Sequence, residues 1–522
     1  MSLVRAGAPA KVPLSTLLAL RLGRIMIPEP PILDPHPPDE LSLGRMFRRF
    51  FQILTLIFCL FLVVRTTFVE PHGVPTGSMA PTIYGNHRQC PCPRCGYSIV
   101  VGNPAEGAYN PQTAAYCLNC GLSGIDMVPL SETISGDRML VDRCVFRIRS
   151  PRRWEMAVFH APDDTKIPYV KRVVGLPGEA IRIHDGDAYA NGELLRKPLD
   201  ALREMKILLF DMDHAPQPMG WTRRWVVESV ATLQLPAGIG GGPDTPIEKI
   251  VDGDRLILDA SARAETTLGL SYRHRNVDTG IEELIRDDHG YNGLRGVPKP
   301  AHDFILDCEI EVIGGTGTLS FRLGDGSDAV RLDLSIGTSD RPSTLNHDGA
   351  AAPHQLPTLQ FHTSQRYSLE LAFVDRRATV AVDGRAVGLP SEVFVPTLGT
   401  AKTPSGLPPE RRGTARPLQI EARGVSVVLR HLKLSRDVQY RVEGENAIAE
   451  AWQLGRDEYF MLGDNSPSSE DSRAWKKPGV PEGDFIGKPF LVHQPLRIGR
   501  LVLNGKERRF QTIDWDRFRF LK

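Results

Sequence analysis

The sequence VPTGSMAPT, at positions 74–82, begins a few residues after the one long apolar run of the chain. It sets Ser78 between a glycine and a methionine, in a turn rich in proline and threonine. A serine on such a turn is a candidate nucleophile, but serine is also among the commonest residues of ordinary turns. The stretch alone does not distinguish a catalytic serine from an ordinary turn serine. The choice depends on whether the rest of the chain contains partners for a catalytic serine.

A second block supplies a candidate base. The sequence YVKRVVGLPGE, at 169–179, predicts a largely buried strand that carries Lys171 among apolar neighbours. A lysine on a strand usually points toward solvent, but burial lowers the pKa of an amine because it penalises the charged form. A neutral lysine can take the proton of a serine hydroxyl. A third block, GDNSPSSEDSR at 463–473, offers polar groups to hold such a pair.

Composition sets broad limits on the protein. Its 522 residues are enough for two or three domains. The 63 basic and 62 acidic residues give a net charge of +1, so bulk electrostatics do not indicate a nucleic-acid partner. The 48 glycines and 42 prolines favour turns and short strands over long helices, which predicts a mainly β fold.

The N-terminal region predicts a tail followed by a membrane anchor. Residues 1–44 are broken by repeated prolines and are expected to be disordered. The apolar run at 14–20 is at the lower length limit for a signal peptide and no clean cleavage site follows it, so a cleaved signal peptide is not expected. Residues 50–64 are almost wholly apolar, but this is shorter than the roughly 20 residues usual for a spanning helix, so a buried core helix is the alternative. Flanking residues extend the run to a predicted anchor at 45–68. The preceding arginines 45, 48 and 49 favour a cytoplasmic N-terminus.

Two C-x-x-C-G motifs predict a metal site. Cys92 and Cys95 form the first and Cys117 and Cys120 the second, with about twenty residues between them, a spacing typical of a four-thiolate zinc ribbon at 88–124. Two disulfides are the alternative, because the predicted side of the membrane can be oxidising. Cys90 is a spare that could replace a ligand. A closed four-cysteine site has no open position for water, so the expected zinc is structural and catalysis needs no cofactor.

Taken in order, the blocks resemble the type I signal peptidases, which are membrane-bound Ser/Lys endopeptidases. The resemblance rests on the Ser78 turn after the anchor, the Gly136-Asp137 turn, the Lys171 strand and the third block. It implies these roles: Ser78 as nucleophile, Lys171 as general base, the Ser78 amide and the Thr76 hydroxyl as the oxyanion hole, Ser469 as the residue that orients the lysine, and Asp471 with Arg473 as a supporting pair.

Three departures from the family pattern surround these residues. Glu179 stands where the family usually has aspartate, and Trp154-Glu155 stands for a Gly-Asp pair. Ser-Pro-Ser at 466–468 stands for the usual Arg-Asp-Asn. All three concern groups that would support the dyad, and none replaces Ser78 or Lys171.

The resemblance implies removal of N-terminal signal peptides from secretory precursors with small residues before the cut. It also implies a single-pass protein of a bacterial cytoplasmic membrane, with the N-terminus in the cytoplasm and the catalytic domain outside. The expected partners are those precursors and membrane lipid, with no nucleic acid. The catalytic domain is predicted at 69–198 and 441–522.

Residues 199–440 are predicted as an insertion, a connector followed by a β-sandwich. The pattern resembles the concanavalin-like and laminin-G-like jelly rolls, which implies a carbohydrate or protein ligand; a purely structural domain is the alternative. Strands are expected at 304–313, 318–323, 330–336, 367–374, 378–382 and 425–434.

Two other functions remain open at this stage. The chain could be a catalytically impaired, membrane-anchored binding or scaffold protein that uses the ribbon and the sandwich. It could also be a regulated protease of one partner, as in the related self-cleaving repressors. The membrane anchor favours precursor processing over the second of these.

Overall fold

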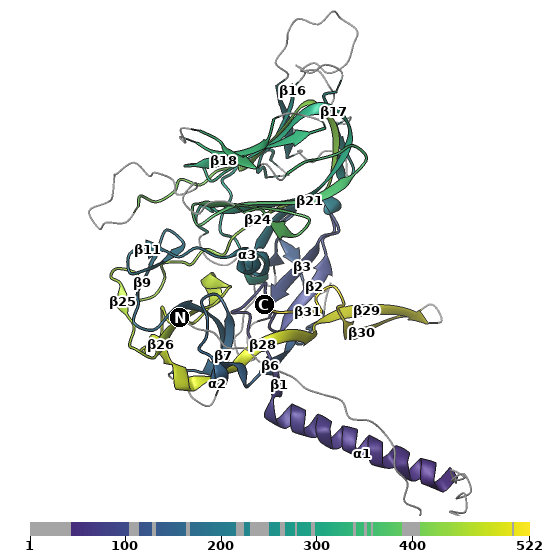
Figure 1. The fold of residues 1–522 in the computed structure, drawn as a ribbon, viewed down its shortest axis with the longest axis vertical. Coiled ribbons are helices and arrows are strands. Elements are labelled where there is room, and N and C mark those ends of the chain that lie inside the picture. Colours follow the sequence, from purple (N-terminus) through teal and green to yellow (C-terminus); the bar gives the residue numbers. More distant parts are fainter. Residues whose placement is uncertain are drawn as a thin grey trace, which may run out of the picture. The chain divides into compact units, whose positions relative to one another are not determined.

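Strands are far more abundant than helices in the part of the chain that the structure describes, so the predicted mainly β fold is confirmed (Figure 1). The structure is a computed structural model. It describes residues 43–103, 114–127, 132–162, 167–215, 224–229, 250–261, 267–276, 279–293, 298–337, 341–348, 352–356, 359–388, 408–503 and 506–522. The predicted tail therefore lies outside the described residues, except for its last two positions.

One long helix covers the predicted anchor. Helix α1 runs over Leu43–Thr67 and is 25 residues long, about 38 Å at the usual rise of an α-helix. Its segment Gly44–Val63 is long and apolar enough to cross a membrane, with a mean hydropathy of 1.9, and none of it is buried. The helix extends beyond the short apolar run on both sides.

An eight-stranded sheet joins two distant parts of the chain. Its order is β1-β6-β28-β7-β8-β26-β27, with β31 paired to β28. Strand β8 contributes Lys171 and pairs with β26, which leads directly into the third block. The strands are β1 Val69–Gly73, β6 Arg138–Asp142, β7 Met156–His160, β8 Pro168–Gly175, β26 Glu458–Leu462, β27 Gly479–Pro481, β28 Phe485–Gln494 and β31 Arg519–Phe520.

Strand β8 is buried on both faces. One face packs Val173 against Tyr459, Met461 and Trp475. The other places Val174 in a separate cluster with Ile181, Phe460 and Leu462. This explains why the strand is almost continuously apolar, since only a strand covered on both sides has no polar face. Its lysine and arginine are consequently buried as well.

The region predicted as a sandwich forms a 13-stranded sheet that includes two long strands. Residues 304–313 and 318–323 were expected as separate strands, but they form one 21-residue strand, β17 (Phe304–Gly324). Its first half pairs with β21 and its second half with β18. Gly315, at φ +90°, lies between the two halves where the register shifts. A glycine bulge lets a strand bend from one layer to the next without ending, which the expectation of two strands overlooked.

Strand β24 (Leu418–Arg436) makes the same transition and begins before the predicted residue 425. Figure 1 shows β18 and β21 in the two facing layers, and a large apolar core lies between them. Part of the expected connector also belongs to this sheet, because β12 pairs with β24. The other strands are β12 Ile207–Asp211, β13 Trp225–Ser229, β14 Val251–Asp252, β15 Arg255–Asp259, β16 Thr267–Tyr272, β18 Ala329–Ile336, β19 Ser343–His347, β20 His354–Leu356, β21 Arg366–Val374, β22 Arg377–Val382 and β23 Arg385–Ala386.

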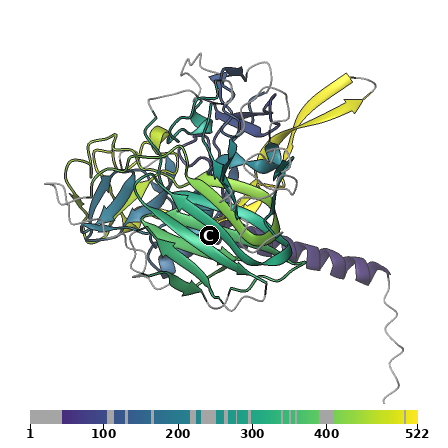
Figure 2. The ribbon, with the colours of Figure 1, turned by 90° about the horizontal axis from the view of Figure 1, so that it is seen from above.

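Several smaller elements complete the described chain. Strand β29 (Leu496–Leu503) pairs, within the described residues, only with β30 (Lys506–Ile513). This hairpin projects from the other strands in Figures 1 and 2. The others are α2 Val145–Ile148, α3 Leu199–Met205, the ribbon strands β2 His87–Pro91, β3 Ser98–Gly102, β4 Ala114–Ala115 and β5 Ile125–Asp126, and the small sheet of β9 Ala180–His184, β10 Asp187–Ala190, β11 Glu193–Leu194 and β25 Trp452–Gln453.

Buried ion pairs connect the sandwich to the catalytic part. The Lys197 ammonium lies 2.9 Å from Asp375 and 2.7 Å from Asp437 and is 4.9 Å from the centre of the Trp154 ring. Burial acts to lower the pKa of Lys197, but the two carboxylates overcome it and raise that pKa well above its ordinary value. Arg411 bridges Asp185, Asp187 and Asp303 in the same way. These pairs hold the two regions together because a lone buried charge is very costly.

We predict that Lys197→Ala lowers the free energy of unfolding by about 3–5 kcal/mol, because it leaves Asp375 and Asp437 buried without a counter-ion. Urea denaturation followed by tryptophan fluorescence measures the loss, and Trp154 lies next to the altered site. The matched control is Lys522→Ala, which removes a lysine whose pair with Asp200 is largely exposed and should cost less than about 1 kcal/mol. Equal effects of the two substitutions would contradict a structural role for the buried junction.

Candidate active site

The Ser78 turn follows β1 and is closed by its own backbone. The Ala80 amide donates to the Gly77 carbonyl at 3.1 Å, and the Ile83 amide donates to the Met79 carbonyl at 2.9 Å. Met79 is fully buried in the core beneath the sheet and anchors the turn. Ser78 itself is half-buried. A buried residue directly after the serine therefore fixes the turn and leaves the hydroxyl at the surface of a cleft.

That cleft is a cavity of about 430 Å³. Ser78 and Lys171 both line it, so the structure brings the two predicted dyad residues to one site. Thr76 is also in the lining. Most of the remaining wall is apolar and comes from the end of β1, from β6 and β7, and from β8 with the residue before it: Val74, Met139, Val158, Ile167, Tyr169 and Val170. Its polar members are His72, Ser468 and Glu470.

Lys171 is 2% exposed, and its ammonium donates to the Ser469 hydroxyl at 3.0 Å. Burial lowers the pKa of Lys171 to about 8 and outweighs the nearby carboxylate of Asp471, which acts to raise it. A substantial fraction of this lysine is therefore neutral near physiological pH, as a general base requires.

Gly463 lies where the third block meets the Ser78 turn. A Cβ atom at this position would stand 2.2 Å from the Ser469 hydroxyl and 2.5 Å from the Ser78 carbonyl oxygen. Any side chain would thus separate Ser469 from the turn. The glycine is required by this close approach of three segments.

Asp471 and Arg473 form the predicted supporting pair. The guanidinium donates from Nε to one carboxylate oxygen and from Nη2 to the other, each at 2.8 Å. Burial acts to raise the pKa of Asp471, but Arg473 overcomes it and holds that pKa below its usual value. Asp471 also accepts from the Gly463 amide at 3.1 Å. The pair thus holds the backbone that carries Gly463 against Ser78.

A second buried pair was not singled out from the sequence, although its members lie in the quoted blocks. Arg172 binds both carboxylate oxygens of Asp464, at 2.8 and 2.7 Å, and both residues are fully or nearly fully buried. The Thr82 hydroxyl donates to the same carboxylate at 2.6 Å. These contacts hold β8, the third block and the end of the Ser78 turn together. An arginine directly after the candidate base in an apolar strand was the available signal, since a buried arginine needs a partner.

The peptide that carries the Ser78 amide is held by Asn465. Within the described residues this amide donates no hydrogen bond. The Gly77 carbonyl belongs to the same peptide plane and accepts a hydrogen bond from the Asn465 side chain at 2.9 Å. The Ser78 carbonyl accepts one from the backbone N–H of Asn465 at 3.0 Å. Asn465 therefore fixes the plane that carries the Ser78 N–H. The structure places Thr76 in the cleft wall and shows no bond that assigns its hydroxyl a role.

The departures from the family pattern have local compensations. Trp154 has φ +70°, a conformation that favours glycine, yet its ring is buried and its backbone is held at both ends. Its amide donates to the Val173 carbonyl at 2.7 Å, and its carbonyl accepts from Arg172 at 2.7 Å. Glu179 binds Arg153, and so it acts as an ion-pair partner outside the cleft. These two departures thus lie outside the cleft, whereas Ser468, from the third departure, is in its lining.

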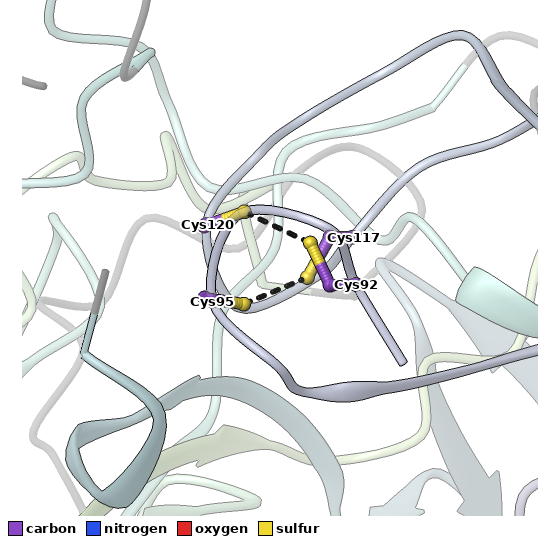
Figure 3. Close-up of side chains that lie close together, drawn as sticks. All are labelled: Cys92, Cys95, Cys117 and Cys120. Atoms are coloured by element: carbon purple, nitrogen blue, oxygen red, sulfur yellow. Dashed lines mark hydrogen bonds between the residues drawn. The ribbon is translucent and has the colours of Figure 1, made fainter. Parts of the chain in front are cut away.

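The four ribbon cysteines converge (Figure 3). Their sulfurs lie within 4.8 Å of one another, with 3.6 Å between Cys92 and Cys120 and 3.5 Å between Cys95 and Cys117. A tetrahedral zinc with bonds of about 2.3 Å sets its sulfurs about 3.8 Å apart, so the arrangement fits zinc. The cross-motif pairs are also the ones that two disulfides would join.

Both cysteine motifs have the same backbone. Gly96 and Gly121 each have φ +74°, and each donates its amide to the carbonyl of the first cysteine of its motif. The positive φ is the reason for glycine after each C-x-x-C. Cys90 instead contacts the Met127 sulfur at 3.3 Å, so it is not among the converging thiols.

A family model and two curated relatives match the chain. The model described as signal peptidase, peptidase S26, matches residues 124–229 and 379–493, which include Lys171 and the third block, whereas Ser78 precedes them. The Signal peptidase I of Rickettsia typhi is 28% identical over 159 residues, 30% of this chain and 49% of that protein. The chain is similar to the type I signal peptidases. The resemblance predicted from the sequence is thus confirmed.

The second relative supports the same assignment. The Signal peptidase I of Pseudomonas aeruginosa is 29% identical over 178 residues, 34% of this chain and 48% of that protein. The chain thus spans about half the length of these curated relatives. The gap between the two ranges that the family model matches lies within residues 199–440.

Solved structures resemble part of the chain only weakly. The galectin LEC-6 of Caenorhabditis elegans aligns with 26% of this chain and 83% of its own, at 12% identity and a TM-score of 0.17. The carbohydrate-binding module CBM66 of Bacillus subtilis aligns with 41% of this chain and 94% of its own, at 9% identity and a TM-score of 0.21. Scores this low leave the ligand of the sandwich unassigned.

We predict that the purified protein holds one zinc ion and that Cys117→Ser releases it, because the loss of one thiolate opens the four-sulfur site. Elemental analysis of metal content measures the change. Cys90→Ser is the matched control, since this neighbouring thiol does not converge with the others, and it should retain the metal. Metal-free protein without titratable ribbon thiols would instead establish the disulfide alternative.

Proposed function

We propose that this protein is a membrane-bound serine endopeptidase that removes N-terminal signal peptides from exported precursors. The observation that supports this most is the burial of Lys171, with its lowered pKa, in the cleft that also contains Ser78. A buried amine of this kind is suited to activate a serine hydroxyl without histidine. The family relation and the candidate membrane helix point to the same class.

The proposed reaction proceeds through an acyl-enzyme. Neutral Lys171 accepts the proton as the Ser78 oxygen attacks the scissile carbonyl, and the Ser78 amide with the Thr76 hydroxyl stabilises the oxyanion. The resulting ammonium gives its proton to the leaving amine as the peptide bond breaks. Lys171 then takes a proton from water, which attacks the ester and releases Ser78. Ser469 holds the amine in place through its hydrogen bond.

The cleft suits precursors with small residues before the cut. Its wall near Ser78 is built mostly from apolar side chains, among them Val74, Val158 and Val170. Such a wall favours small apolar groups, because they can be buried there without losing hydrogen bonds to water. Secretory precursors carry small residues of the A-x-A type before the cut.

The proposed site of action is a bacterial cytoplasmic membrane crossed once by α1. Arginines 45, 48 and 49 at the start of the helix favour a cytoplasmic N-terminus, which places the catalytic part on the outer side. The proposed partners are secretory precursors and membrane lipid, and the near-zero net charge offers no support for nucleic acid. A carbohydrate or protein ligand for the sandwich, and a structural zinc in the ribbon, remain proposals.

We predict that Ser78→Ala and Lys171→Ala each lower cleavage of a peptide with an A-x-A site by about 10³-fold or more, since each removes a member of one catalytic unit. The assay uses the full chain in detergent micelles and follows the products by mass spectrometry. Ser261→Ala, an exposed serine of the insertion, is the control and should cleave like wild type. A folded wild-type protein that cleaves no such peptide would favour the scaffold or the single-partner protease.

We predict that kcat/KM rises with pH through an apparent pKa of about 8, because only the neutral amine of Lys171 accepts a proton. Below that pH the rate should fall about tenfold per unit. Glu470 acts to raise the pKa of Lys171, so Glu470→Gln should move the rising limb to lower pH. A profile that is flat from pH 6 to 10, or that moves the other way in the variant, would exclude this lysine as the base.

A further inference from the structure

A short segment of the insertion, His289–Asn292, lies against the Ser78 turn. Its last three residues form the 3₁₀ helix η2 (Gly290–Asn292). The segment is about 210 positions after the turn in sequence, and each of His289, Tyr291 and Asn292 contacts the turn or a residue that holds it. The insertion therefore contributes side chains beside the proposed nucleophile.

His289 binds the far end of the turn. Its Nε2 lies 3.1 Å from the Ala80 carbonyl oxygen, and the side chain is almost fully buried. Burial lowers the pKa of His289 to about 3, so the ring is neutral at working pH. Because a carbonyl only accepts, Nε2 carries the hydrogen. This contact is one fixed hydrogen bond that does not change with pH.

Tyr291 fills the space beneath the glycine before the nucleophile. A Cβ at Gly77 would stand 2.0 Å from the Tyr291 ring. The ring stacks on Tyr84, with 5.6 Å between the centroids, and its hydroxyl donates to the Asn86 carbonyl at 3.1 Å. The turn thus rests on an aromatic side chain of the insertion.

Asn292 and Asn465 form a reciprocal amide pair. Asn292 Nδ2 donates to Asn465 Oδ1 at 2.7 Å, and Asn465 Nδ2 donates to Asn292 Oδ1 at 2.8 Å. Asn465 Nδ2 also donates to the Gly77 carbonyl at 2.9 Å. Because this carbonyl only accepts, the Asn465 side chain must turn its Nδ2 toward it. That choice fixes which atom of Asn465 is oxygen, and so it also fixes the N and O positions of the Asn292 side chain. Asn465 is fully buried, and Asn292 is the side chain that satisfies its carbonyl oxygen.

The Gly77 carbonyl and the Ser78 N–H belong to one planar peptide and point in opposite directions. Whatever holds the carbonyl therefore aims the N–H, which is the proposed oxyanion donor. We propose that Asn292 is a positioning residue, supplied by the insertion, which acts through Asn465 to orient the peptide plane between Gly77 and Ser78. The inference rests on the proposed function, since the orientation matters only if Ser78 forms a tetrahedral intermediate.

The loss of Asn292 leaves the buried Asn465 amide with an unpaired acceptor and one unpaired donor hydrogen. Because unsatisfied buried polar groups are costly, we expect the Asn465 side chain to turn toward other hydrogen-bond partners. It then releases the Gly77 carbonyl. The Gly77 carbonyl then keeps only its bond from the Ala80 amide, so the Ser78 N–H is held less firmly. A misplaced oxyanion donor weakens transition-state binding while substrate contacts in the cleft remain.

The test compares Asn292→Ala with wild type in the full-length protein in detergent, using the A-x-A peptide. We expect kcat to fall about 10- to 100-fold with KM within about twofold, the pattern of an interaction that acts in the transition state. Asn292→Asp keeps an acceptor for Asn465 Nδ2 but sets a carboxylate oxygen against Asn465 Oδ1 in place of the Nδ2 donor, so it should not recover the loss. Gln355→Ala, an exposed amide on an outer strand of the insertion, is the control and should match wild type.

Hydrogen exchange provides a readout that needs no activity. In Asn292→Ala the Ala80 amide, which closes the turn on the Gly77 carbonyl, should exchange faster, while amides of β8 and β26 keep their protection. Unchanged kcat with unchanged exchange overturns the proposal, as does a raised KM with unchanged kcat. If wild type cleaves nothing while Ser78→Ala behaves identically, the proposed function fails. The exchange result then decides alone whether Asn292 holds the turn.

Discussion

The pairing of β8 with β26 is the constraint on which the rest of the site depends. It sets Arg172 opposite Leu462 and so brings together segments whose paired charges, Arg172 and Asp464, are 292 positions apart. Because β8 is covered on both faces, the pairing takes Lys171 out of water and lowers its pKa. The same contact delivers Ser469 to the lysine. The burial and pairing of β8 thus account for both the lowered pKa of Lys171 and its contact with Ser469.

The insertion is part of the same structure and is not an independent attachment. Lys197 of the catalytic part pairs with Asp375 of the sandwich, and Arg411 of the sandwich pairs with Asp187 of the catalytic part. Separating the two regions would leave these buried charges without partners, which costs far more than exposing ordinary surface. On the other side, the segment His289–Asn292 supports the Ser78 turn. A domain inserted for another purpose would not need contacts with the proposed nucleophile.

Much of the fold was predictable because apolar alternation and turn residues are local signals. The strands expected at 330–336, 367–374 and 378–382 lie within one residue of the observed β18, β21 and β22. The continuity of β17 was not predictable, since glycines at 314, 315 and 317 usually end a strand, and here they form a bulge that bends it between layers. The roles of Arg172, Asn465 and Asn292 were missed for a related reason. Each depends on a partner far away in sequence.

By itself, the sequence determined the kinds of chemistry present: a serine on a turn, a lysine in an apolar strand, two cysteine motifs and one apolar segment long enough for a membrane. Residue types and their local spacing are sufficient for that, because reactivity and hydrophobic length belong to single residues and short segments. Only the tertiary structure decided that Ser78 and Lys171 share a cleft, that the four thiols converge, and that Asn292 reaches Asn465. These are contacts between distant segments, and packing, burial and peptide orientation exist only once the chain has folded.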